Sequence, residues 1–368
     1  KKPDIADWFY IPSWQRSLPP HFQVINNETP QECWLIFVDD CGLGDRIVQR
    51  LKLQGHNIIT VRRGEEFTST ESQGDRSYTL NPKHRGDYDR LIQELRTLNF
   101  LPIKIVHLWS VTPVNETELA IAEVQDAQER GFYSLLFLTQ ALGAENNSHQ
   151  LQIKVISNNM QAVSPNEILY PQKATVIGLV KVIGQEYQNI HCYSIDIILP
   201  TSGSWQEEKL TEKLLIELTA PSTDRIVAYR GGHRWVQTFK QVSLPAISKT
   251  PKLKTGGLYL IVGGLGSLGL VLAEYLAQKF QAKLILTGRS SFPLRDEWSQ
   301  WLMKDDVTSS KIRKLLELES FGAEVMVVKA DTANLEQMQH AIAQAEKRFG
   351  TINGAIHSVA TSLTERMR

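Results

Sequence analysis

Short apolar segments alternate along the chain with segments whose apolar positions recur every three or four residues. Residues 32–39 (ECWLIFVD) are of the first kind, and Ile47, Val48 and Leu51 just after them are of the second. The first pattern predicts buried strands, and the second predicts helices that turn one face toward them. In the first two thirds of the chain, strands are predicted at 32–39, 56–61, 103–109, 151–157, 191–199 and 225–239, and helices at 44–54, 87–98, 118–142, 174–186 and 209–218.

The alternation starts again after residues 243–254, a stretch that contains two prolines and has no periodicity. Strands are then predicted at 258–262, 283–287, 324–330 and 353–357, and helices at 267–280, 294–303, 309–321 and 335–349. Such alternation is typical of parallel βαβ units, and strands that are apolar on nearly every residue are covered on both faces. We therefore expect an α/β fold with two Rossmann-like doubly wound parallel sheets, in domains at 1–245 and 257–368 joined by a linker at 246–256.

The composition excludes several classes of protein. The 368 residues include 40 Lys and Arg against 40 Asp and Glu, without the basic excess that binds nucleic acids or anionic membranes. No apolar run approaches the ~18 residues of a membrane span, and the start of the chain has no signal-peptide pattern. The 3 cysteines fit neither a disulfide framework nor a metal-binding spacing. We expect a cytoplasmic protein with no metal, nucleic-acid or membrane partner and, since it begins with Lys, one cut from a longer polypeptide.

The strongest motif is the glycine-rich stretch VGGLGSLG, between a predicted strand and a predicted helix. Gly263 and Gly264 permit a tight turn. Gly266, which lacks a Cβ, lets the backbone approach a pyrophosphate, and Gly269 lets the helix pack closely. The start of the helix then offers unpaired N–H groups to phosphates, whereas the alternative is a glycine-rich turn with no ligand. The predicted dinucleotide site comprises Gly263, Gly264, Gly266, Ser267, Leu268 and Gly269.

The end of the second strand of this domain indicates which dinucleotide is bound. Sites that prefer NAD carry Asp or Glu there, about 20 residues after the glycines, to hold the ribose 2′-hydroxyl. This strand ends in Thr287-Gly288-Arg289-Ser290, which contains no carboxylate. Because a guanidinium suits a 2′-phosphate, we predict NADPH as the cofactor, with Arg289 and Ser290 at that phosphate.

Asp331 and Thr332 follow the third strand of the same domain. A carboxylate at this position can accept a hydrogen bond from the adenine amino group, or it can cap the helix predicted at 335–349. The two roles can coexist, because Asn334 can cap that helix instead.

The first domain has the same strand–loop–helix order but a different loop. Its first strand is followed by DDCGLGD, so that Asp39, Asp40 and Asp45 accompany two glycines. Three carboxylates would repel a pyrophosphate and cancel the attraction of the helix N-terminus. We therefore predict that the first sheet lacks a cofactor site.

Together these motifs resemble the ketoreductase domain of modular type I polyketide synthases, a family of short-chain dehydrogenase/reductases. The resemblance rests on VGGLGSLG, on LTGRS after the second strand, and on GAIH at 354–357. Upstream, WFYIPSWQR at 8–16, IDI at 195–197 and AYRGG at 228–232 resemble the structural subdomain that precedes the catalytic one. The resemblance covers essentially the whole chain. It implies NADPH-dependent reduction of a β-ketoacyl thioester, carried on the phosphopantetheine arm of an acyl carrier protein, beside neighbouring synthase domains.

The resemblance also implies roles for residues at the strand ends. The glycines would contact the phosphates, Asp331 and Thr332 the adenine, and Ser358 the region of the nicotinamide ribose. The family usually ends its fourth strand in an Ala-Gly pair, where this chain has Ser358-Val359-Ala360.

The family's catalytic Ser, Tyr, Lys and Asn act after the fourth strand, so we predict no catalytic residue in this chain and no reduction by the chain alone. A polypeptide extended by about 100–150 residues should be active. Tyr275 and Lys279 form a YxxxK pattern, but on the helix that serves the phosphates, so we interpret them as helix surface. Two functions stay open: part of an active reductase, favoured by the intact glycines, and a non-catalytic pseudo-ketoreductase scaffold, favoured by the missing set and by Ala360.

Overall fold

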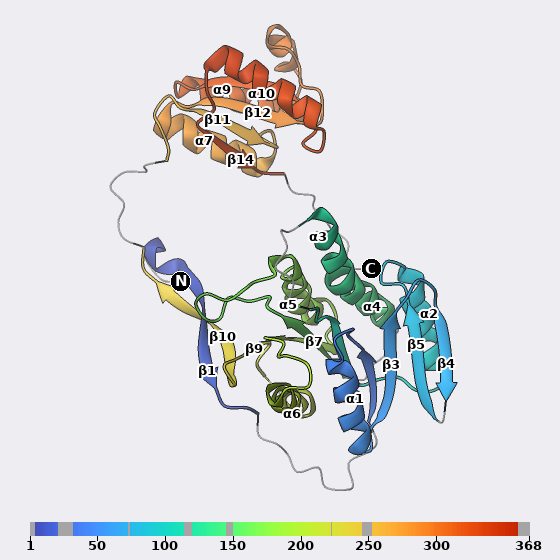
Figure 1. Ribbon diagram of the computed structural model, residues 1–368. Coiled ribbons are helices and arrows are strands. Elements are labelled where there is room, and N and C mark those ends of the chain that lie inside the picture. The colour runs from blue at the N-terminus through green and yellow to red at the C-terminus, as the bar shows by residue number, and fades with distance from the viewer. Residues whose placement is uncertain are drawn as a thin grey trace. The chain divides into compact units, whose positions relative to one another are not determined.

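A computed structural model describes residues 4–20, 32–72, 74–113, 120–144, 150–221, 223–244 and 252–359. The described residues up to Leu244 form one compact unit, called unit 1, and those from 252 onward form a second, called unit 2. Each unit is a sheet covered by helices (Figure 1). No helix among these residues is long and apolar enough to cross a membrane. Most of the predicted linker, and Ala360, lie outside the described residues.

Unit 1 contains a ten-stranded sheet in the order β1-β10-β9-β8-β7-β6-β2-β3-β5-β4. The strands from β9 to β5 in this order run parallel, whereas β10, β1 and β4 pair antiparallel with their neighbours. The strands are β1 (Phe9–Ser17), β2 (Cys33–Phe37), β3 (Asn57–Arg63), β4 (Thr68–Ser72), β5 (Asp75–Leu80), β6 (Lys104–Ser110), β7 (Leu151–Asn158), β8 (Ile190–Ile197), β9 (Ile226–Arg230) and β10 (His233–Val242). The buried parallel strands at β2, β3, β6, β7, β8 and β9 were predicted, whereas β1, β4 and β5 were not.

Helices cover both faces of this sheet, as the predicted doubly wound fold requires. Leu35 and Phe37 of β2 pack in a cluster with α2, α4 and α5, while Trp34 and Ile36 pack in another with α1 and α6. Successive side chains of a strand point to opposite faces, so β2 is buried on both. The helices are α1 (Leu43–Leu53), α2 (Arg85–Thr97), α3 (Ile121–Ala127), α4 (Ser134–Gly143), α5 (Val176–Glu186) and α6 (Trp205–Thr219), with 3₁₀ turns η1 (Ile5–Trp8) and η3 (Pro171–Lys173).

The helix predicted at 118–142 contains an irregular turn. Its described part runs from α3 through a π-helical segment, η2 (Gln128–Tyr133), into α4. Gly131 of this segment lies against β6, because a Cβ there would be 2.9 Å from the Ser110 hydroxyl oxygen. Single π turns of this kind are not visible in a hydrophobic pattern of period 3.6.

Unit 2 has a four-stranded parallel sheet in the order β13-β12-β11-β14, which confirms the predicted doubly wound parallel sheet. Tyr259 and Ile261 of β11 pack toward α7 and α9, and the alternate residues Leu258 and Leu260 pack in a cluster with α10. The elements are β11 (Leu258–Val262), α7 (Ser267–Phe280), β12 (Lys283–Gly288), η4 (Arg295–Glu297), α8 (Trp298–Trp301), α9 (Val307–Ser320), β13 (Glu324–Lys329), α10 (Leu335–Phe349) and β14 (Gly354–His357).

Candidate cofactor site

The residues predicted to contact the cofactor all lie at the carboxyl edge of the unit 2 sheet. Because β12 and β14 both pair in parallel with β11, the segments that follow these strands stand side by side. The Ser358 N–H donates to the Val262 carbonyl (2.9 Å), and the Ala330 N–H donates to the Gly288 carbonyl (3.0 Å). The strand ends thus bring together Gly263, Gly264, Gly266, Ser267, Leu268, Gly269, Arg289, Ser290, Asp331, Thr332 and Ser358.

Close backbone contacts explain the glycines of the loop after β11. Gly263 has a φ of +75°, and a Cβ on it would lie 2.9 Å from the Ser358 carbonyl oxygen. A Cβ on Gly269 would lie 2.6 Å from the Gly263 carbonyl oxygen and 2.7 Å from the Gly264 Cα. The first turn of α7 therefore packs directly on the loop backbone, an approach that only glycine permits.

The start of α7 is open to a ligand. Gly266 is its N-cap, and no side chain of the described residues caps the helix. Gly266, Ser267 and Leu268 are exposed, and a Cβ on Gly266 would have, among the described atoms, only the Gly263 carbonyl oxygen (3.2 Å) within 4 Å. Uncapped N–H groups at the start of a long helix, with space beside them, fit a phosphate group.

Polar side chains with free bonding capacity surround this opening. Arg289 and Ser290 are exposed, and Arg289 makes no ion pair within the part of the chain that the structure describes. The hydroxyls of Thr287 and Ser358 are buried and have no hydrogen-bond partner among the described residues. The exposed Arg289 and Ser290 therefore offer a cation and a hydroxyl to a polar, anionic ligand at the end of β12.

Asp331 does not cap α10. The Asn334 side chain does so, accepting a hydrogen bond from the Gln337 N–H (3.0 Å). One Asp331 carboxylate oxygen accepts from the Ala333 N–H (3.1 Å), in a turn at the strand end. The role of Asp331 as the cap of α10 is therefore wrong. The Asp331 carboxylate can still accept a hydrogen bond from a ligand.

In unit 1 the corresponding loop holds its own anion. Asp39 is buried, and its carboxylate accepts hydrogen bonds from the N–H groups of Cys41 (2.8 Å), Leu43 (3.3 Å) and Gly44 (2.5 Å). Burial raises the pKa of Asp39, and these three hydrogen bonds act in the opposite direction. The N–H groups at the start of α1 are therefore already bonded where a phosphate would have to bind.

The two other carboxylates of this loop are paired rather than free. Asp40 contacts Arg63 and lies 3.9 Å from Arg130, and Asp45 contacts Arg62. Repulsion by three bare carboxylates, the reason given from the sequence, is therefore incorrect for Asp40 and Asp45. What fills the position is the single buried carboxylate of Asp39.

The YxxxK pattern is surface, as predicted. Tyr275 is 48% exposed on α7, where its ring contacts Phe280, and Lys279 is exposed. The other tyrosine of unit 2, Tyr259, is buried in β11 and accepts a hydrogen bond from the Lys254 N–H (2.7 Å). Neither hydroxyl is placed at the carboxyl edge, so the described part of unit 2 has no tyrosine for proton transfer.

Comparison with known proteins identifies the architecture. Residues 257–367 match the family model described as "KR domain", and residues 33–217, half of the chain, match "Beta-ketoacyl synthase-like, N-terminal". The polyketide synthase PksM of Bacillus subtilis (strain 168) is 38% identical over 148 residues, which cover 40% of this chain and 3% of the relative. PksL from the same organism is 28% identical over 214 residues, covering 57% of this chain and 5% of the relative. This chain belongs to the ketoreductase family of polyketide synthases.

Solved ketoreductase structures share its fold. An N-terminal ketoreductase from the macrolactin assembly line superposes with a TM-score of 0.69 at 26% identity, covering 96% of this chain and 65% of that chain. A multidomain structure with an adenylation domain, a ketoreductase and a pseudo-Asub domain has a TM-score of 0.70 at 24% identity, covering 93% of this chain and 27% of that chain, and supports the fold alone. The family is one of oxidoreductases that bind NAD(P)H, and the chain spans a small part of the curated synthases it matches.

Unit 1 of this ketoreductase contains a buried ion pair that was not predicted from the sequence. Arg230, at the end of β9, contacts the Asp196 carboxylate of β8 (2.6 Å) and the Glu167 carboxylate (3.0 Å). Asp196 also accepts hydrogen bonds from the N–H groups of Met160 (3.0 Å) and Gln161 (2.9 Å). The pair ties the ends of β8 and β9 to the loop after β7. The only signal in the sequence was a charged residue within each of two apolar runs.

Proposed function

We propose that unit 2 binds NADPH and forms the cofactor half of a β-ketoacyl reductase. The substrate would be a β-ketoacyl thioester on the phosphopantetheine arm of an acyl carrier protein, and neighbouring synthase domains would deliver it. When bound, the cofactor supplies the hydride. The observation that carries the proposal is the arrangement at the carboxyl edge of the sheet. The start of α7 is uncapped and exposed there, Arg289 is exposed, and the segment directly after β12 contains no carboxylate.

Each group at the edge has a role in this proposal. The N–H groups at the start of α7 bind the pyrophosphate, because they are uncapped and exposed. Arg289 and Ser290 bind the 2′-phosphate, Asp331 and Thr332 lie by the adenine, and Ser358 lies by the nicotinamide ribose. Unit 1 serves as the structural domain, because Asp39 already bonds the N–H groups of its loop.

The preference for NADPH is testable with a single substitution. A guanidinium on the 2′-phosphate contributes about 1.5–3 kcal/mol, or about 10–150-fold in affinity. We expect NADPH to bind the unchanged protein at least tenfold more tightly than NADH, and Arg289→Ala to abolish that preference without changing NADH affinity. Arg348→Ala, an exposed arginine at the far end of α10, is the matched control. Equal affinities for the two cofactors in the unchanged protein contradict the assignment.

A pseudo-ketoreductase scaffold is the second candidate, favoured by the lack of a tyrosine at the carboxyl edge among the described residues. The macrolactin ketoreductase chain is matched over only 65% of its length, so we propose that the proton-donating residues lie beyond the matched part. A polypeptide extended by about 100–150 residues should then oxidise NADPH, followed at 340 nm, with a β-ketoacyl thioester. If the extended protein binds NADPH but never oxidises it with such substrates, the scaffold function is correct.

A further inference from the structure

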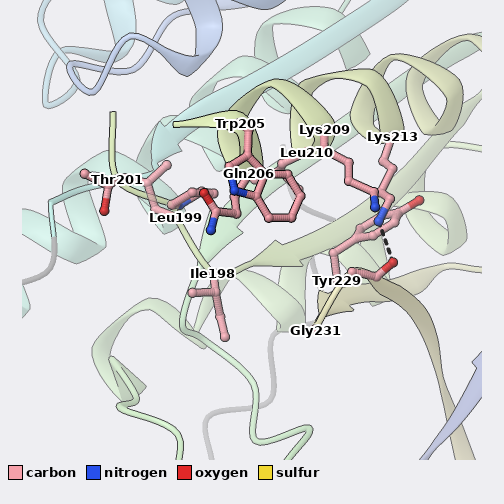
Figure 2. Close-up of a pocket in the computed structure, with 12 residues that line it drawn as sticks. Ile198, Leu199, Thr201, Trp205, Gln206, Lys209, Leu210, Lys213, Tyr229 and Gly231 are labelled. Atoms are coloured by element: carbon pink, nitrogen blue, oxygen red, sulfur yellow. Dashed lines mark hydrogen bonds between the residues drawn. The ribbon is translucent and has the colours of Figure 1, made fainter. Parts of the chain in front are cut away.

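A cavity in unit 1 is lined by other residues than the loop that holds Asp39. It lies where β8 and β9 end, under one face of α6, and has a volume of about 580 Å³ (Figure 2). This is within the size range of small-molecule sites, roughly 300–1,000 Å³. Neither the family fold nor the proposed reduction uses it, because the proposed cofactor site belongs to unit 2.

One face of α6 supplies the chemistry of the cavity. Trp205, Lys209 and Lys213 are spaced four residues apart, so they line the same side of the helix. Figure 2 shows both lysine side chains pointing toward the turn at Gly231, with Trp205 between them and Leu199. The cavity therefore has a cationic end and an apolar end.

The charge at the cationic end is not neutralised. None of the lining residues, all within the described part of the chain, is Asp or Glu. Three of the four acidic side chains of α6 pair with arginines: Glu207 with Arg46 (2.9 Å), Glu208 with Arg50 and Glu217 with Arg234 (2.8 Å). The fourth, Glu212, is exposed and does not line the cavity. Lys213 donates to the Gly232 carbonyl, which uses only one of its three N–H bonds. Burial and the neighbouring Lys209 lower the pKa of Lys213, so an anion bound between the two ammonium groups would relieve their repulsion.

The large apolar side chains at the apolar end are exposed to solvent. Trp205 is 69% exposed, and Ile198 on the opposite wall is 43% exposed. A large aromatic ring left in water beside aliphatic side chains is typical of a binding surface for a flat or apolar group.

We propose that this cavity binds a small organic anion with a flat apolar body: an aryl carboxylate, sulfonate or phosphate ester. The anionic group binds Lys209 and Lys213, and the apolar body lies on Trp205 and Ile198. The site is separate from the dinucleotide site, so the whole chain can hold both ligands.

The test uses two dyes that differ mainly in one charge. 8-Anilino-1-naphthalenesulfonate is titrated into the whole protein beside N-phenyl-1-naphthylamine, which lacks the sulfonate. The neutral dye controls for general adsorption to apolar surface. We expect Lys209→Gln with Lys213→Gln to weaken the sulfonate at least tenfold, the size expected for lost charge-assisted hydrogen bonds, and the neutral dye less than twofold. Trp205→Ala should weaken both dyes.

Matched variants distinguish the site from a general charge effect. Lys181→Gln, which removes an exposed lysine of α5, should change neither affinity, and Lys209→Arg combined with Lys213→Arg should keep the sulfonate affinity. Thermal unfolding of every variant checks that the fold is retained. Equal sulfonate affinity in the unchanged protein and in the Lys209→Gln, Lys213→Gln variant would overturn the proposal.

Discussion

Replacing Asp39 with asparagine tests whether a single buried carboxylate holds the loop of unit 1 together. The substitution keeps the shape of the side chain but turns one acceptor oxygen into an NH₂ donor. In the native loop both oxygens accept, one from Gly44 and the other from Cys41 and Leu43. An asparagine can satisfy only one of these two sides, whichever way its amide is turned.

The favourable orientation of the introduced amide keeps its oxygen on the Cys41 and Leu43 side. The Gly44 N–H then loses its hydrogen bond to the carboxylate (2.5 Å) and faces the NH₂ group of the asparagine instead. A lost hydrogen bond to a charged group is worth about 1.5–3 kcal/mol, and an unsatisfied buried N–H costs about 1–3 kcal/mol. The two energies partly describe the same loss, so they do not add in full. We therefore expect Asp39→Asn to lower the free energy of local unfolding at α1 by about 2–4 kcal/mol.

Hydrogen exchange measured by mass spectrometry reads this change locally, which matters because two units are not expected to unfold in one step. Amides of α1 should exchange about 30–900-fold faster in Asp39→Asn, since each 1.4 kcal/mol is tenfold. Amides of α7 in unit 2 serve as an internal reference. Asp40→Asn is the matched control, because Asp40 is an exposed partner of Arg63 and such pairs contribute about 0–1 kcal/mol. If the α1 amides exchange at the same rate in Asp39→Asn and Asp40→Asn, Asp39 does not organise the loop.

Three further outcomes follow from the same contacts. Gly269→Ala should reduce NADPH affinity at least tenfold in calorimetric titration, because the new Cβ would lie 2.6 Å from the backbone of the loop. Gly178→Ala in α5 is the control and should leave NADPH affinity unchanged, because a Cβ there would have no described atom within 4 Å. Arg230→Met should destabilise unit 1 by about 3–5 kcal/mol in denaturant unfolding, because Asp196 stays buried without its cation, whereas the exposed Arg225→Met should cost under about 1 kcal/mol. A protein of residues 1–245 should fold and show no thermal shift with NADPH, and a clear shift would contradict the role assigned to Asp39.

The parallel cores of both units were predictable from the hydrophobic pattern, whereas the edge strands β1 and β4 of the unit 1 sheet were not. β2 reads as a strand because both of its faces are buried, and α7 and α10 have bounds that match the prediction. By contrast β4 is exposed along its whole length, so its TSTES sequence has no apolar signal. β1 is half exposed and pairs with β10, more than two hundred residues later, a contact that no local pattern encodes.

The candidate site was predictable where backbone geometry demands one residue type. Glycine is required at 263 and 269 by contacts under 3 Å, so the sequence displays the requirement directly. Side chains that act through partners were less visible. An aspartate in a loop has the same sequence signal whether it is exposed, as Asp40 is, or buried against three N–H groups, as Asp39 is. Only the fold decides which of two adjacent carboxylates turns inward.

The two units show that one strand–loop–helix plan can meet the same electrostatic requirement in two ways. A helix that starts at the end of a central parallel strand presents N–H groups and a partial positive charge that must be bonded by something. In unit 1 the chain supplies the anion itself, and Gly44 is small because a Cβ there would lie 2.8 Å from the Asp39 carboxylate. In unit 2 the equivalent position carries no acidic side chain, the glycines keep the approach open, and the helix start is exposed. The structural Rossmann unit and the candidate cofactor-binding unit thus differ in the source of the negative charge at the helix start. In unit 1 it is the side chain of Asp39, and in unit 2 it would be a bound ligand.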